Sequence, residues 1–278
     1  MAKLDQYIGL ALIGKSERTV NTYRAQLQKF DDYLRGSGTS MDEPLTRIDV
    51  QQYITHLTNK GHKASSVNLS FNSIRSYAKW SNQESAIQQI RVVKQIPILQ
   101  RTPKSLGRNE RNQLLRRAEQ KQNRRDIAIV TMLLHCGLRV GELVALNVRD
   151  VELKRGGVVH VNRGKGNKER QVPLPAEARN RITEYLEQRP GCPDDEPLFL
   201  SNRGKRISIR MVEYMLKQLG DECHPHLCRH AFVRGLLDQG VDLVTVAKLA
   251  GHSDLNVTRS YATPSMENMV EAMERLYT

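Results

Sequence analysis

The sequence lacks the marks of a membrane-bound or secreted protein. No apolar run approaches membrane-spanning length, and the apolar segment near the N-terminus is too short for a signal peptide. The four cysteines among the 278 residues show no spacing typical of a secreted disulfide framework. We therefore expect a globular protein of the cytoplasm that does not bind a membrane.

Several kinds of cofactor site are missing as well. The Gly-Lys-Gly segment around Lys165 lacks the Ser or Thr and the helix that follow in a Walker A loop, so nucleotide binding is not indicated. The sequence contains no cluster of carboxylates of the kind that is typical of a magnesium site. Residues 223–230 mix cysteine with histidine, but they lack the second ligand pair of a zinc finger or ribbon. We expect no cofactor and no metal.

Positive charge is in clear excess. Lys and Arg number 43 against 30 for Asp and Glu, which gives a net charge of +13 and a pI near 9.7. This balance favours a polyanionic partner over a small acidic substrate, although a generic basic surface, as in ribosomal proteins, has the same composition. With 39% apolar residues, the chain can bury a core and form two domains.

Helical periodicity runs through the first 95 residues. Apolar residues recur at intervals of three and four within residues 16–34, with Ser16 as N-cap and Gly36 beyond the end. Further helices are predicted at residues 49–59, from Ser65 onward, and at residues 84–93. The result is a small all-helical domain. It is either a packing module or a DNA-binding module whose basic face includes Lys63, Arg75 and Lys79.

A basic linker is predicted next. Pro97 and Pro103 interrupt the helical period at residues 94–110. Residues 101–125 contain nine basic and two acidic side chains. This excess of basic side chains indicates either a solvated helix face or a nucleic-acid contact. The DNA-binding candidates in this segment are Arg101, Lys104 and Arg108.

The first notable pair of charges in the second half is Arg139 and Glu142. An apolar helix predicted at residues 126–136 stops at Gly137, and a new helix begins at about Arg139. An arginine between two core helices is costly to leave unpaired. It either forms a structural pair with Glu142 or is held for an anionic ligand.

One β-hairpin is predicted in this half. Residues 158–161 and 171–174 form its strands, and Lys165 lies at the glycine-rich tip, where a solvated turn is the simpler interpretation. Helices are predicted at residues 176–188 and 208–219, with a short strand at residues 198–201. The expected fold class is therefore α+β, mainly α with a small β-hairpin in the C-terminal domain.

Residues 223–261 carry the densest group of reactive side chains. Pro225 suits the first turn of a helix, which would place His226, Arg229 and His230 on one face. A second helix, at residues 242–250, ends at Gly251. His252 follows at the break, and Ser253 is the expected cap of a third helix that carries Tyr261.

Five segments together resemble the ordered motifs of the tyrosine site-specific recombinases, the phage integrase family. They are GLRVGEL at residues 137–143, GKGNKER at 164–170, HLCRH at 226–230, LAGHSD at 249–254 and VTRSYA at 257–262. Cys228 stands where the family usually has leucine, at a packing position. The N-terminal part resembles the family's core-binding domain only in size, helicity and position.

The resemblance implies a role for each matching residue. Tyr261 would be the nucleophile, Arg139 and Arg229 the phosphate clamps, Lys165, His226 and His252 the proton-transfer or positioning groups, and Glu142 the support of Arg139. The chemistry of these side chains agrees. Guanidinium groups stabilise charge on a phosphodiester, and a phenol with a pKa of about 10 needs a base, which His226 can supply. A covalent 3′-phosphotyrosyl link preserves the ester, so rejoining needs neither ATP nor metal.

The resemblance also implies an architecture. We expect a SAM-like core-binding domain at residues 1–95, a basic linker at 96–108 and a catalytic domain at 109–278 that ends in a tail helix. The tail is expected either to pack on its own domain or to pass to a neighbouring protomer.

The expected partner is double-stranded DNA with inverted-repeat core sites. On it, a homotetramer would exchange tails and strands through a Holliday junction, and accessory proteins are further candidate partners. Because the chain begins close to the core-binding helices, it is more similar to resolvases of replicon dimers or transposon cointegrates than to large phage integrases. Three alternatives stay open: an integrase-excisionase, a DNA-binding regulator without catalysis, and a relaxing enzyme of the type IB topoisomerase kind.

Overall fold

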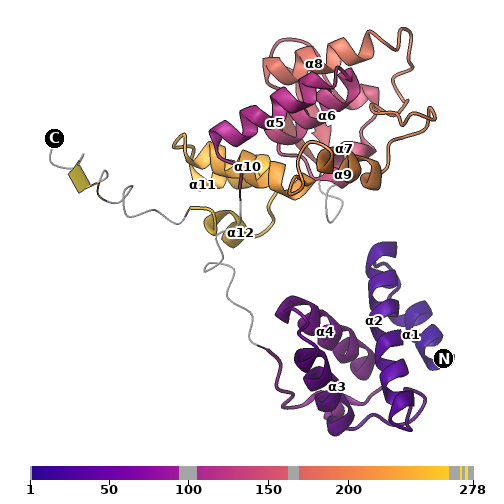
Figure 1. The fold of residues 1–278 in the computed structure, drawn as a ribbon. Helices are drawn as coiled ribbons and strands as arrows, with labels where there is room; N and C mark the ends of the chain where they lie inside the picture. The colour runs from indigo at the N-terminus through magenta and orange to yellow at the C-terminus, as the bar shows by residue number, and fades with distance from the viewer. Residues whose placement is uncertain (1, 94–104, 162–168, 263–269, 271–272, 275–278) are drawn as a thin grey trace. The chain divides into compact units, whose positions relative to one another are not determined.

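The computed structural model describes residues 2–93, 105–161, 169–262, 270 and 273–274. The chain forms two compact units, which we call the N-terminal unit (Met1–Ile96) and the C-terminal unit (Pro97–Thr278). Each has its own hydrophobic core, and each is described separately (Figure 1).

The N-terminal unit is helical in its described part. Its elements are α1 (Ala2–Ala11), α2 (Glu17–Gly36), α3 (Arg47–Asn59), α4 (Ala64–Trp80) and the short 3-10 helix η1 (Glu84–Ile87). The helix α1 was not predicted, and it contributes the fully buried Tyr7 to the core. The helix predicted at residues 84–93 is wrong, because only the single turn of η1 forms there.

Side-chain caps fix where these helices begin. Ser16 caps α2 as predicted, accepting a hydrogen bond from the Thr19 backbone N–H at 3.2 Å. Thr46 and Asp49 form a capping box at the start of α3. Helix α2 continues through Gly36, two residues past the predicted end, and Ser37 is its C-cap.

The C-terminal unit contains helices and a single hairpin in its described part, so the prediction of a mainly α fold with a small β-hairpin is confirmed. Its helices are α5 (Arg108–Gln120), α6 (Arg124–His135), α7 (Val140–Ala145), η3 (Val148–Asp150), α8 (Ala176–Leu186), α9 (Ile209–Lys217), α10 (Pro225–Leu237), α11 (Leu243–Ala250) and α12 (Leu255–Arg259). Helix α6 is buried along most of its length, and α5, α8 and α10 pack against it (Figure 1).

The hairpin consists of β1 (Val158–Val161) and β2 (Arg170–Pro173), paired antiparallel with Val159 opposite Val172. Alternate residues face the core, so Val159 and Val172 are buried while Gln171 is exposed. The strand predicted at residues 198–201 is wrong. Within this segment only Leu200 forms an isolated bridge, with Arg206.

The polypeptide turns sharply on both sides of α11. Asp242 caps the helix start by accepting from two backbone N–H groups, and Gly251 ends it in the left-handed conformation with φ of +64°. Asp254, not the predicted Ser253, caps α12, since its carboxylate accepts from the Asn256 backbone N–H. Tyr261 follows two residues after the end of α12.

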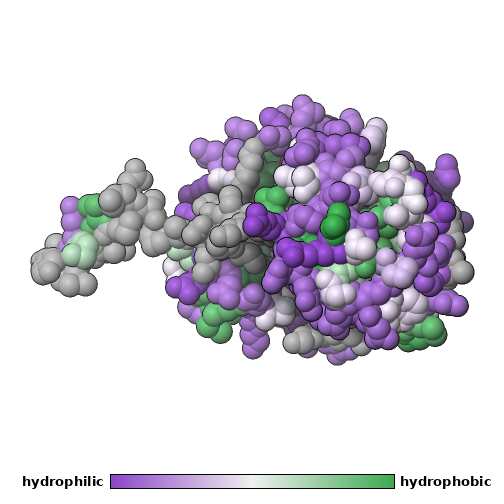
Figure 2. Space-filling view, turned by 90° about the horizontal axis from the view of Figure 1, so that it is seen from below, coloured by the Kyte–Doolittle hydropathy of each residue, from purple (hydrophilic) through white to green (hydrophobic). Residues whose placement is uncertain are grey.

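Hydrophilic side chains predominate on the face that Figure 2 shows, with hydrophobic ones scattered between them. Across the described ranges, no helix combines the length and apolar character that crossing a membrane requires.

Candidate active site

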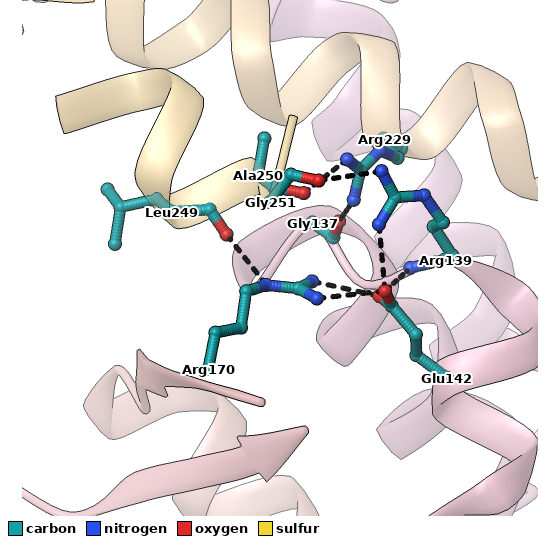
Figure 3. Close-up of polar contacts among 8 residues, drawn as sticks. All are labelled: Gly137, Arg139, Glu142, Arg170, Arg229, Leu249, Ala250 and Gly251. Atoms are coloured by element: carbon teal, nitrogen blue, oxygen red, sulfur yellow. Dashed lines mark hydrogen bonds and ion pairs between the residues drawn. The ribbon is translucent and has the colours of Figure 1, made fainter. Parts of the chain in front are cut away.

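Arg229 is a deeply buried charge of the site, with 4% of its surface exposed, the same fraction as Glu142. Helix α10 carries it between two polypeptide turns. Its guanidinium donates to the carbonyl oxygen of Gly137 at 2.6 Å and to that of Ala250 (Figure 3). Burial, followed by the charge of Arg139, lowers the pKa of Arg229 to about 10, so the group remains cationic at neutral pH.

Gly137 makes this approach possible. Its φ is +59°, and a Cβ at this position would lie 2.1 Å from the Phe232 ring on α10. Only glycine fits between the end of α6 and α10, and its carbonyl group then reaches Arg229.

Arg139 lies at the start of α7, where Glu142 holds it from both ends. The Glu142 carboxylate accepts from the backbone N–H and from Nη1 of Arg139, both at 2.8 Å. The Nη2 of Arg139 donates to the carbonyl oxygen of Gly251, also at 2.8 Å. The predicted pair with Glu142 is present, and it fixes the guanidinium beside the end of α11 (Figure 3).

Arg170 is a functional candidate that the sequence analysis did not select. It lies at the start of β2, and its two Nη atoms each donate to one oxygen of Glu142 at 2.8 Å. Its guanidinium lies close under Gly251, where an added Cβ would come within 2.9 Å of Cζ. Arg170 therefore links the hairpin that leads to Lys165 with α7 and the end of α11 (Figure 3). Its inclusion in the motif at residues 164–170 was the available signal.

The charges of this cluster are not balanced. Three guanidinium groups, those of Arg139, Arg170 and Arg229, surround the single carboxylate of Glu142, which leaves a surplus of two positive charges among these four side chains. Burial of Glu142 would raise its pKa, but hydrogen bonds from Arg170 and Arg139 outweigh this and lower the pKa to about 2.

Glu142 is expected to stabilise the fold in a pH-dependent way. A carboxyl group whose pKa falls from 4.5 to about 2 on folding contributes stability above pH 4.5 and loses it as the pH falls through 2. We expect the Glu142→Gln variant to lack about 3 kcal/mol of this pH-dependent free energy of unfolding.

Urea unfolding followed by circular dichroism between neutral and acid pH measures the effect. Fluorescence would not, because the single tryptophan, Trp80, lies in the N-terminal unit. Glu187→Gln is the matched control, because the Glu187 side chain is 62% exposed. Equal acid sensitivity in the parent protein and the Glu142→Gln variant would contradict the prediction.

Tyr261 is buried, with 5% of its surface exposed, and packs with Phe232, Val246 and Ala250. Burial raises its pKa to about 12, against a smaller opposing effect of the Arg229 charge. Its hydroxyl contacts Nδ1 of His230 on α10. The phenol is therefore protonated at neutral pH and held by a histidine that the sequence analysis placed on the right helix face but did not select.

His252 directly follows Gly251 at the end of α11. Its Nδ1 shares a hydrogen bond of 2.8 Å with the buried Thr258 hydroxyl, which orients the ring. Burial, followed by the charges of Arg229 and Arg139, lowers the pKa of His252 to about 4, so the ring is neutral at neutral pH. His226 is exposed in the first turn of α10, and its ring centroid lies 6.4 Å from that of His230.

Other candidates lie away from this cluster or outside the described residues. Lys165, Arg101 and Lys104 fall outside the described ranges, as does most of the predicted tail helix. Lys63, Arg75 and Lys79 are exposed at or along α4, and Arg108 is exposed at the start of α5. The Arg75 guanidinium lies over the Phe71 ring at 4.7 Å.

The zinc alternative gains no support from the part of the chain that the structure describes. No three His, Cys, Asp or Glu side chains there are grouped closely enough to hold a metal ion. Cys228 is buried, which raises its pKa to about 12 and keeps the thiol protonated.

Family models match both units. Residues 104–268 match the model of the phage integrase family, and residues 4–85 match the phage integrase N-terminal SAM-like domain. The first match alone covers more than half of the 278 residues.

Relatives match over nearly the full chain. A tyrosine recombinase XerA of Thermococcus kodakarensis is 33% identical over 273 residues, which cover 96% of this chain and 92% of the relative. A tyrosine recombinase XerD of Staphylococcus epidermidis is 31% identical over 291 residues, covering 99% and 97%.

Solved structures share the fold. A XerH site-specific recombinase bound to its difH substrate has a TM-score of 0.75 at 20% identity, covering 98% of this chain and 83% of that one. A lambda integrase dimer bound to a COC′ core site has a TM-score of 0.70 at 19% identity, covering 94% and 76%. The site geometry, the two family models and the relatives agree, and the chain belongs to the phage integrase family of tyrosine recombinases.

Proposed function

We propose that this protein cuts and rejoins DNA at specific sites through a covalent 3′-phosphotyrosyl intermediate, with Tyr261 as the nucleophile. The observation that carries the proposal is the surplus of positive charge around the buried Glu142, next to a buried tyrosine. A phosphodiester supplies the missing negative charge, and its charge increases further as a nucleophile attacks.

Arg139 and Arg229 are the groups that bind this phosphate. Glu142 and the Gly251 carbonyl group fix the guanidinium of Arg139, and two carbonyl groups fix that of Arg229, so little reorganisation is needed when charge develops. The Arg139 side chain is 27% exposed, which leaves it open to an incoming ligand.

The remaining candidates move or hold protons. His252 is neutral and held through Nδ1 by Thr258, so its Nε2 suits a hydrogen bond to a phosphate oxygen. His226 is proposed for the same phosphate, and Lys165 is proposed to protonate the departing 5′ oxygen, because an ammonium group is a suitable acid for an alkoxide. Joining runs the same steps in reverse and needs no outside energy source, since the tyrosyl ester stores the energy of the broken bond.

For the biological role, we propose the resolution of replicon dimers or of cointegrates. Similarity to Xer recombinases along 92–97% of their length supports this assignment over integration or excision. Strand exchange between two sites requires four active centres, so the proposed assembly is a homotetramer on DNA in which C-terminal tails pass between protomers. Lys63, Arg75, Lys79, Arg101, Lys104 and Arg108 are proposed to contact the DNA backbone.

The test begins with binding sites that the protein selects from random duplex DNA. A selected site is then nicked near the cleavage position, so that the released fragment diffuses away and the covalent complex accumulates. We expect a DNA adduct on the peptide that contains Tyr261, joined through the 3′ phosphate, as identified by mass spectrometry. Specific binding with no adduct on any selected site would instead indicate a regulator without catalysis. Relaxation of supercoiled DNA without site preference would indicate a topoisomerase.

A further inference from the structure

The structure brings a second histidine of α10 into contact with the nucleophile. The Tyr261 hydroxyl contacts Nδ1 of His230, and the two ring centroids lie 5.3 Å apart. His226, the base expected from the sequence, lies one turn earlier on α10 and is exposed. The partly buried His230 is therefore the histidine in place to receive the phenolic proton.

The protonation states and the tautomer of His230 together set the direction of this hydrogen bond. Burial, followed by the charges of His226, His224 and Arg229, lowers the pKa of His230 to about 4, so its ring is neutral at neutral pH. The pKa of Tyr261 is raised to about 12, so the phenol keeps its proton. In the tautomer of His230 that carries its proton on Nε2, Tyr261 donates to Nδ1, and this is the tautomer that the proposal below requires.

We propose that His230 is a catalytic residue that accepts the proton of Tyr261 during attack on DNA. This inference rests on the proposed function. As the Tyr261 oxygen forms its bond to phosphorus, its proton passes to Nδ1 of His230. The bond from phosphorus to the 5′ oxygen breaks, its electron pair leaves with that oxygen, and Lys165 supplies the proton that the oxygen takes up. On rejoining, His230 returns its proton to Tyr261.

The same contact keeps the resting nucleophile inactive. With an imidazole pKa of about 4 facing a phenol pKa of about 12, almost no phenolate forms in the free protein. A bound phosphate brings a negative charge close to His224, His226, His230 and His252, which favours the protonated form of His230 and raises its pKa. Bond formation to phosphorus lowers the pKa of the phenol at the same time. Proton transfer therefore becomes favourable only when DNA is in the site.

The test separates activation of the nucleophile from protonation of the leaving group. The substrate is a selected site with sulfur in place of the bridging 5′ oxygen at the cleavage position, because a thiolate leaves without needing an acid. His230→Asn keeps a hydrogen-bond acceptor near the place of Nδ1 but has no basicity. We expect adduct formation to slow by about 10²-fold or more near neutral pH, with unchanged DNA affinity.

The pH profile separates a base from a structural support. In the His230→Asn variant only the phenolate reacts, so the rate should rise about tenfold per pH unit from about pH 7 to about pH 10, while the parent rate stays nearly level. The His230→Phe variant should show the same slope as His230→Asn. The control is His160→Asn, because His160 lies on β1 and pairs with Glu152, and this variant should behave as the parent protein does.

Three results would overturn the assignment. The first is a parent-like rate of adduct formation in the His230→Asn variant. The second is a slow rate in this variant with a pH profile like that of the parent protein. The third is a loss of adduct formation that only matches the loss of folded protein measured by circular dichroism. Failure of the proposed function is a different outcome, since the parent protein itself would then form no adduct.

Discussion

Replacing Tyr261 with phenylalanine is expected to abolish covalent attachment to DNA while specific binding stays intact. The Phe ring keeps the contacts with Phe232, Val246 and Ala250, so the fold loses little beyond the hydrogen bond to His230, worth about 1 kcal/mol. Only the attacking oxygen is removed. Denaturing electrophoresis of the nicked-site reaction measures the adduct, and a mobility shift on the same DNA measures binding.

Tyr185→Phe is the matched control for this experiment. Tyr185 has the same exposed fraction as Tyr261, 5%, and its hydroxyl also makes one hydrogen bond, accepting from the Leu200 backbone N–H. It lies on α8, away from the arginine cluster. We expect parent-like adduct formation from this variant. An adduct that persists in the Tyr261→Phe variant would show that another residue attacks, and the assignment of Tyr261 would be wrong.

Local signals made most of the C-terminal fold predictable. Pro225 does occupy the first position of α10, Asp242 and Gly251 do bound α11, and β1 forms at the predicted residues. Each of these features depends on residues within one or two turns of chain, where capping and glycine conformation act. The fold class was predictable for this reason.

Elements without such a signal were predicted poorly. Helix α1 has few polar residues to mark a face, and the apolar residues at 84–93 pack against α3 and α4 without continuing a helix beyond η1. Residues 198–200 are apolar but find no continuous partner strand among the described residues. Packing between elements determined the secondary structure of these segments, and a local sequence pattern carries no information about that packing.

The site itself was only partly predictable. Arg139 and Glu142 are three residues apart, so their pairing could be expected from the sequence. The bond from Arg170 to Glu142 spans 28 residues, and the contact of Tyr261 with His230 spans 31. Both depend on how the hairpin and the end of α12 return to the helices. The family motif includes Arg170 and His230, but motif membership does not say which atoms they touch.

Replacing Arg229 with lysine is expected to slow DNA cleavage by about 10³-fold with little change in binding. Lysine keeps one positive charge but loses the planar fork. It cannot hold the positions that the guanidinium takes between the carbonyl groups of Gly137 and Ala250 and also face a phosphate. Because the charge on the phosphate grows during attack, the loss falls on the transition state more than on binding, to which many phosphate contacts contribute.

Arg189→Lys is the matched control for the loss of structural hydrogen bonds in Arg229→Lys. Arg189 also donates to two carbonyl groups, those of Pro197 and Leu198, and its side chain is 13% exposed, but it lies after α8 and outside the arginine cluster. Loss of structural hydrogen bonds should therefore cost both variants stability, as measured by urea unfolding, while only Arg229→Lys loses cleavage. Single-turnover cleavage at saturating protein separates the chemical step from binding. If the cleavage rate fell only in proportion to affinity, Arg229 would bind the ground state and transition state alike, and its proposed role in stabilising the developing charge would be wrong.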